Sequence, residues 1–199
     1  VRCCDRSWGG HRFLPDRRDL NRSFPGSARG SLAGRIAHLM MTEVVHRCSV
    51  GIDLHTGSDH RTNLPQVRGD LGNPLALEMA ERFAAPLSLN ARTRDGSLRA
   101  AATNAGAKVL LFEGGEADRF DEDAIETATS GVLRVMAGEQ MVDDAPDPVG
   151  PTRLSWSSGW VRASRAGIAH TEVEPGVVVQ PGDTLAVVHD PFGKRLSTI

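Results

Sequence analysis

Alternating apolar and polar residues predict a strand near position 50. Val50, Ile52 and Leu54 are apolar at every second position, which is the period of a strand with one buried face. The stretch 49–58 therefore predicts a buried strand that runs into a polar loop. Two further apolar runs predict strands, a short one at 86–90 and a continuous one at 108–112.

Apolar residues at helical spacing predict four helices around these strands. The first is capped by Ser31, presents Leu32 and Ile36 on one face, and is expected to end near Arg47. The other three begin at capping residues 73, 97 and 121 and end near 84, 104 and 141. Residues 57–72 are expected to form a loop. Strands that alternate with helices indicate an α/β fold with a mixed, mostly parallel sheet and flanking helices.

The character of the chain changes after the last predicted helix. Residues 142–153 contain three prolines and predict a linker. Residues 154–199 are rich in Val and Gly, and turn signals such as Glu174-Pro175-Gly176 are typical of short β-strands. We therefore expect an α/β domain over 1–141, this linker, and a small all-β module over 154–199.

Two polar side chains come directly after predicted buried strands. His55 follows the first of these strands, and Glu113 follows the apolar run at 108–112. Because parallel strands bring their carboxyl ends to one edge of a sheet, where open α/β sheets bind ligands, we expect both side chains in one pocket. Asp53 shares a strand face with His55, which makes His55 a candidate metal ligand or base. A histidine that only closes the strand with a hydrogen bond is the other interpretation, and the pattern leaves both open.

The first thirty residues are densely charged and show no helical period. Five arginines lie between Arg6 and Arg22, with Asp16, Asp19 and Asn21 among them. Arginine forks bind carboxylates through two parallel hydrogen bonds, so this cluster would suit an acidic substrate. A charged surface loop without a ligand is the alternative.

Composition narrows the class of protein. The 199 residues are 40% hydrophobic and 24% charged, which is typical of a soluble globular protein. The formal net charge is -2 and no long basic run occurs, so we expect no nucleic-acid partner and no binding to an anionic membrane. Three cysteines, at 3, 4 and 48, without a CxxC spacing argue against disulfides and indicate a reducing, cytoplasmic compartment.

Several motifs together resemble the succinylglutamate desuccinylase/aspartoacylase family, which has the zinc carboxypeptidase-like fold. They are Arg12-Phe13-Leu14-Pro15 followed by Asp19-Leu20-Asn21-Arg22-Ser23-Phe24-Pro25-Gly26, then Asp53-Leu54-His55-Thr56-Gly57, and then Phe112-Glu113-Gly114-Gly115-Glu116. The resemblance also takes in Gly159-Trp160-Val161 and Asp190-Pro191-Phe192-Gly193. It covers nearly the whole chain beyond about residue 11.

The resemblance implies a zinc-dependent hydrolase that cleaves the amide of a small-molecule N-acyl amino acid with metal-activated water. His55 would be a zinc ligand, and Glu113 the general base that activates the water. The residues implied to bind substrate are Arg12, Asn21 and Arg22, which would contact its carboxylate and acyl groups, and Arg99, which would stabilise the oxyanion. This chemistry is consistent, because amide hydrolysis needs an activated water, a Lewis acid and a proton carrier.

The chain departs from the family pattern in its metal ligands. The family carries two zinc ligands on an amino-terminal His-x-x-Glu segment, and no H-x-x-E occurs here: His11 is followed three residues later by Leu14. Since a catalytic zinc needs three protein ligands, we expect an amino-terminally truncated member that lacks its first strand and binds zinc weakly. The carboxy-terminal module resembles half of a biotinyl/lipoyl-like barrel-sandwich, without the Met-Lys-Met hairpin of a lipoylated or biotinylated domain.

Two other functions remain open at this stage. One is a catalytically inert anion-binding or scaffold protein of the same fold, in which the arginine loop holds an anion. The other is a carboxypeptidase-like enzyme that acts on peptides. The sequence leaves the substrate's acyl group and amino acid open, as well as whether the chain forms a homo-oligomer.

Overall fold

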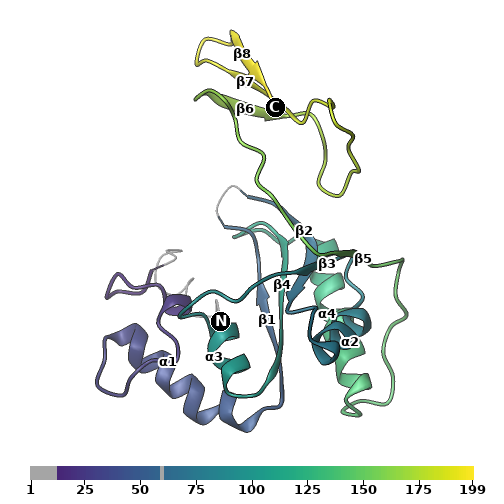
Figure 1. Cartoon of the computed structure of the whole chain (residues 1–199). Helices are drawn as coiled ribbons and strands as arrows, with labels where there is room; N and C mark the ends of the chain where they lie inside the picture. Colours follow the sequence, from purple (N-terminus) through teal and green to yellow (C-terminus); the bar gives the residue numbers. More distant parts are fainter. Residues whose placement is uncertain (1–12, 59–60) are drawn as a thin grey trace. The chain divides into compact units, whose positions relative to one another are not determined.

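The computed structural model describes residues 13–58 and 61–199 of the chain (Figure 1). Internal contacts divide the chain into two compact units, Val1–Ser157 and Ser158–Ile199. All the described residues that the sequence singles out for chemistry belong to the larger unit. No described helix is both long enough and apolar enough to cross a membrane.

A five-stranded sheet forms the centre of the larger unit, with the spatial order β1-β4-β2-β3-β5. The pairs β1–β4, β2–β3 and β3–β5 are parallel, and β2–β4 is antiparallel. The strands are β1 (Val50–His55), β2 (Asn63–Gly69), β3 (Leu87–Asn90), β4 (Lys108–Gly115) and β5 (Arg153–Ser155). The mixed, mostly parallel sheet expected from the alternation of elements is confirmed.

The four predicted helices are present, and each begins at its predicted cap. Side chains of Ser31, Asn73, Ser97 and Asp121 accept hydrogen bonds from backbone N–H groups of the first turns. The helices are α1 (Leu32–Glu43), α2 (Pro74–Phe83), α3 (Leu98–Asn104) and α4 (Glu122–Gly138). The first is shorter than predicted, because residues beyond Glu43 continue as a separate 3₁₀ turn, η3 (Val45–Arg47).

The prediction of a loop over 57–72 is wrong, because β2 occupies residues 63–69. Pro65 lies inside this strand, and proline normally argues against a central strand since it has no N–H to donate. The register of β2 against β4 shifts between Asn63 and Gln66, and this irregularity accommodates the proline. Sequence reasoning therefore missed the strand that lies between β4 and β3.

One face of the sheet packs against α2 and α4 and forms the main core. Val67, Leu110 and Phe112 of the sheet meet Phe83 of α2 and Val135 of α4 in one apolar cluster. The rings of Phe83 and Phe112 stack with centroids 5.6 Å apart. In Figure 1, α2 and α4 lie on one side of the sheet and α1 and α3 on the other. On the other face, Val109 of β4 packs with Ala102 of α3 in a smaller apolar cluster, and polar residues follow at the strand ends.

The smaller unit is a three-stranded antiparallel sheet with the order β6-β7-β8. Its strands are β6 (Ile168–Thr171), β7 (Ala186–His189) and β8 (Arg195–Thr198). The structure draws the boundary between the units after Ser157, because β5 pairs with β3 and so belongs to the larger sheet. The residues that open the expected β-module thus extend the α/β sheet instead.

Candidate active site

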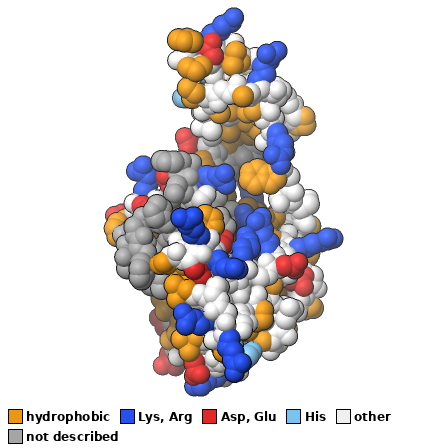
Figure 2. Space-filling model, turned by 90° about the vertical axis from the view of Figure 1, so that its left-hand side faces the viewer, with side chains coloured by type: hydrophobic (Ala, Val, Ile, Leu, Met, Phe, Trp, Pro, Cys, Tyr) orange, Lys and Arg blue, Asp and Glu red, His pale blue; other side chains and the backbone are white. Residues whose placement is uncertain are grey.

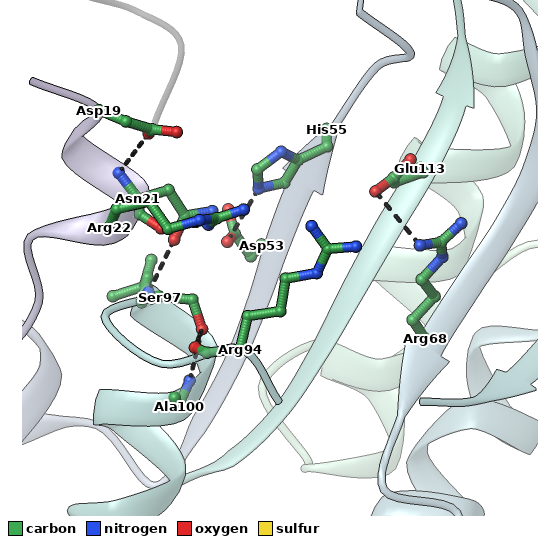
Figure 3. A network of polar contacts seen from close by, with 11 residues as sticks. Asp19, Asn21, Arg22, Asp53, His55, Arg68, Arg94, Ser97, Ala100 and Glu113 are labelled. Atoms are coloured by element: carbon green, nitrogen blue, oxygen red, sulfur yellow. Dashed lines mark hydrogen bonds and ion pairs between the residues drawn. The ribbon is translucent and has the colours of Figure 1, made fainter. Parts of the chain in front are cut away.

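His55 and Glu113 lie side by side at the carboxyl edge of the sheet. Strands β1 and β4 are parallel, and their register pairs His55 directly with Glu113. Paired residues of parallel neighbours point to the same face, so both side chains belong to the face opposite the main core (Figure 3). The register thus makes the two residues direct neighbours at the same edge of the sheet.

Asp53 orients the imidazole of His55. Oδ2 of Asp53 lies 2.9 Å from Nε2 of His55, and the Asp53 carboxylate is buried. Burial would raise the pKa of Asp53, but the hydrogen bond and charge of His55, together with the charge of Arg99, act in the opposite direction, and the pKa lies below its usual value. Leu54 lies between these two residues in the sequence and points to the opposite face of the sheet. It is 46% exposed, because this end of the strand extends past the core.

Two side chains of β2 orient the Glu113 carboxylate. Nδ2 of Asn63 donates a hydrogen bond of 2.5 Å to Oε2. Nη1 of Arg68 lies 3.9 Å from Oε1, and Nε of Arg68 is buried without a hydrogen-bond partner among the described residues. Oε2 is therefore held by a neutral amide, while Oε1 faces a cation and accepts no hydrogen bond from the described part of the chain.

The arginine-rich segment reaches the same edge through the 3₁₀-helix η2 (Leu20–Arg22). Oδ1 of Asn21 accepts a hydrogen bond of 2.8 Å from the backbone N–H of Leu98, the first residue of α3. The backbone N–H of Asn21 in turn donates to Oδ1 of Asp19. In Figure 3 the Arg22 guanidinium points toward Asp53 and His55. Asn21 thus ties this segment to the start of α3 and presents Arg22 at the site.

Arg99 is a buried residue of α3. Its side chain is buried, and Nη2 donates to the carbonyl oxygens of Ala91 at 3.1 Å and Arg92 at 2.5 Å. Burial lowers the pKa of Arg99 below its usual value, and nearby Arg68 adds to this effect. Nη1 has no hydrogen-bond partner among the described residues.

The structure therefore brings together most of the residues that the sequence singled out. His55, Glu113, Asn21 and Arg22 surround one space at the sheet edge, whereas Arg12 lies outside the described residues. Sequence reasoning missed three side chains that share this space: Asn63, Arg68 and Arg94. The polar residues of 63–69 could be predicted to join the site only if that segment was first recognised as a strand.

The described residues fit part of a zinc site. A ligating histidine typically gives its other ring nitrogen to a carboxylate, and Asp53 at Nε2 would leave Nδ1 of His55 for a metal. Among residues 13–58 and 61–199, however, no three His, Cys, Asp or Glu side chains lie close enough to hold an ion together. One histidine is not a catalytic zinc site, since three protein ligands are normal.

The fold and this edge define an α/β protein in which a histidine, a glutamate and several arginines meet at the carboxyl edge of the sheet. The family model of the succinylglutamate desuccinylase/aspartoacylase catalytic domain matches residues 8–138. The chain belongs to this family, as its motifs predicted. Among curated proteins, no sequence matches the chain.

Solved structures of the family share the fold. A succinylglutamate desuccinylase/aspartoacylase from Rhodobacter sphaeroides superposes with a TM-score of 0.82 at 22% identity, over 96% of this chain and 61% of its own. The product-bound ectoine utilization protein EutE from Ruegeria pomeroyi superposes with a TM-score of 0.83 at 20% identity, over 96% of this chain and 61% of EutE. An aspartoacylase family protein from Mesorhizobium loti superposes with a TM-score of 0.72 at 20% identity, over 92% of this chain and 58% of its own. The chain thus spans about 61% of the length of the first two structures.

Proposed function

We propose that the chain provides the base and substrate-binding half of a zinc-dependent hydrolase that removes the acyl group from N-acyl amino acids. The observation that carries this proposal is the pairing of His55 with Glu113 across parallel strands, with the Glu113 carboxylate oriented from β2. Membership of a desuccinylase and aspartoacylase family supports the reaction class. The remaining zinc ligands must come from residues other than those described.

In this proposal Glu113 moves the proton. Its Oε2 is held by Asn63, so the carboxylate keeps one rotamer, and Oε1 remains to accept a proton from the attacking water. The same oxygen can then deliver that proton to the leaving amine. Nη1 of Arg68 lies 3.9 Å from this oxygen, so a cation faces the oxygen that handles the proton. Bound zinc would supply Lewis-acid polarisation of the water and of the scissile carbonyl.

The other residues of the site bind and orient the substrate. Arg22 points toward His55, and its Nη1 donates to the carbonyl oxygen of Asn21. It has no ion pair with a described carboxylate, so its remaining donors can bind a substrate carboxylate. Asn21 fixes that arginine through its bond to Leu98. The proposed leaving group is an amino acid, because its carboxylate would match this positive charge.

The test is hydrolysis by the chain extended with a relative's H-x-x-E segment and loaded with zinc. Substrates are N-acetyl-L-aspartate, N-succinyl-L-glutamate and an unmodified dipeptide. We expect turnover of the acyl amino acids, at least a hundredfold loss in Glu113→Gln with zinc retained, and little zinc or turnover in the unextended chain. Full activity of Glu113→Gln would refute the role of the base, and preference for the dipeptide would favour a peptidase.

A second function is favoured by one specific observation. The described residues hold no three-ligand metal group, while several arginines surround the site. An anion-binding protein of the same fold would need those arginines and no zinc. In that case the extended, zinc-loaded chain would bind N-acyl amino acids and leave them intact.

A further inference from the structure

The loop between β3 and α3, residues 91–97, is fixed to the rest of the larger unit at several points. Its first two carbonyl groups, on Ala91 and Arg92, accept hydrogen bonds from buried Arg99. Its last turn is closed by Ser97, whose Oγ donates to the Arg94 carbonyl at 2.6 Å. The loop has little freedom to move, although its side chains at 92–95 are exposed.

The same loop touches the arginine-rich segment. The carbonyl of Gly96 accepts a 2.9 Å hydrogen bond from the backbone N–H of Phe24. Gly96 has φ +72, and a Cβ at this position would lie 2.6 Å from the carbonyl oxygen of Arg22. Only glycine permits this backbone conformation together with such a close approach. The loop and η2 therefore form one rigid wall of the site.

Arg94 extends from this wall into the site. In Figure 3 its guanidinium lies between His55 on one side and the Glu113–Arg68 pair on the other. Its side chain forms no hydrogen bond or ion pair with any described residue. Arg92, two residues earlier on the same loop, is also exposed.

The charges around Arg94 leave an excess of positive charge. Glu113 faces Arg68, Asp53 faces His55, and Asp70 and Asp53 oppose the charge of Arg99. Arg22 and Arg94 have no carboxylate partner among the described residues. Viewed from the side of α1, Lys and Arg side chains gather in the middle of the larger unit with few acidic side chains between them (Figure 2). Such a field attracts anions.

We infer that Arg94 is a specificity-determining residue that binds a carboxylate of the substrate, and that Arg99 is a positioning residue that holds the loop of Arg94 in place. This inference rests on the proposed function, because it assumes that the substrate occupies the space between His55 and Glu113. Arg99 acts through the carbonyl groups of Ala91 and Arg92, which compensate for the burial of its own guanidinium.

The test of Arg94 is an NMR titration of the whole chain, without metal, with N-acetyl-L-aspartate and with its neutral diamide. Arg94→Gln is compared with the matched control Arg92→Gln, which removes the same charge from the same loop. We expect Arg94→Gln to bind the acid about fivefold more weakly and to lose the preference over the diamide, as for a partly exposed charged contact. Arg92→Gln is expected to stay within twofold of the unmodified chain.

The test of Arg99 is a double-mutant cycle on the same binding constant. Arg99→Lys keeps the charge but removes Nη2, the nitrogen that donates to both loop carbonyls, so it should weaken binding. The effect should vanish in the Arg94→Gln background, because residues that act through one another are not additive. Equal effects of Arg99→Lys in both backgrounds would show that Arg99 does not act through Arg94.

The outcomes separate this inference from the proposed function. If the unmodified chain binds the acid and Arg94→Gln binds it equally well, only the assignment of Arg94 fails. The same holds if Arg92→Gln weakens binding as much as Arg94→Gln. If the unmodified chain binds neither compound, the substrate site and the inference fail together.

Discussion

Asn21 allows a structural role and a binding role to be separated at one position. Its Oδ1 accepts the N–H of Leu98 at 2.8 Å, and this N–H belongs to the first turn of α3, where it has no partner within the helix. Asn21→Ala removes the acceptor and leaves a partly buried donor without a partner. Such a loss costs about 1 kcal/mol of unfolding free energy.

Asn21→Asp should behave differently. The carboxylate keeps an acceptor for Leu98 and places a negative charge at the start of α3, which the helix dipole favours by about 0.3–1 kcal/mol. It also removes the amide N–H donors and adds a charge that repels a substrate carboxylate. We therefore expect stability within about 0.5 kcal/mol of the unmodified chain, but loss of N-acetyl-L-aspartate binding.

The assay is urea unfolding of both variants, combined with the same NMR titration. Asn104→Ala serves as control, because Asn104 is an exposed residue in the last turn of the same helix. Asn21→Ala should lose both stability and binding, and Asn104→Ala neither. Unchanged binding by Asn21→Asp would refute the binding role, and unchanged stability of Asn21→Ala would refute the structural one.

Two further predictions concern packing and pH. A Cβ at Gly131 would lie 2.3 Å from the buried Phe83 ring, so Gly131→Ala should lower the free energy of unfolding in urea by about 1–2 kcal/mol. The control Gly138→Ala meets only the flexible Arg82 side chain and should leave stability unchanged. Equal effects of the two substitutions would contradict this packing of α4. The hydrogen bond from the Ala33 N–H holds the pKa of Asp16 below its usual 3.8, so the stability from this carboxylate is present above its unfolded pKa and is lost as the pH falls through its folded pKa. Between pH 6 and pH 3, the urea midpoint should therefore fall less for Asp16→Asn than for the unmodified chain. Equal falls of the midpoint would show that Asp16 does not contribute to stability.

The sequence was sufficient to predict those elements whose structure depends on neighbouring residues in the chain. Capping residues such as Ser97 and Asp121 act within one turn, so they mark helix starts reliably. The apolar run at 108–112 is long enough to specify a buried strand, and its end places Glu113. Parallel strands predict that Glu113 and His55 share one edge of the sheet; their direct pairing comes from the neighbouring positions and register of β1 and β4.

The rest depended on contacts between distant segments. Pro65 concealed β2, because the bulge that tolerates a proline forms only against β4. Without β2, the sequence offered no reason to place Asn63 and Arg68 beside Glu113, 50 residues away from Asn63 in the chain. Arg94 is one of several arginines in polar loops, and only the folded structure, which directs its guanidinium between His55 and Glu113, distinguishes it.

The central claim is that His55 and Glu113 belong to one hydrolytic metal site. The most direct measurement is anomalous X-ray scattering at the zinc edge from crystals of the chain extended with an H-x-x-E segment, compared with its His55→Ala variant. We expect a single strong zinc signal in contact with Nδ1 of His55, on the Glu113 side of the sheet, and its loss in His55→Ala. A zinc signal that is retained in His55→Ala, or that lies at another edge of the sheet, would contradict the account.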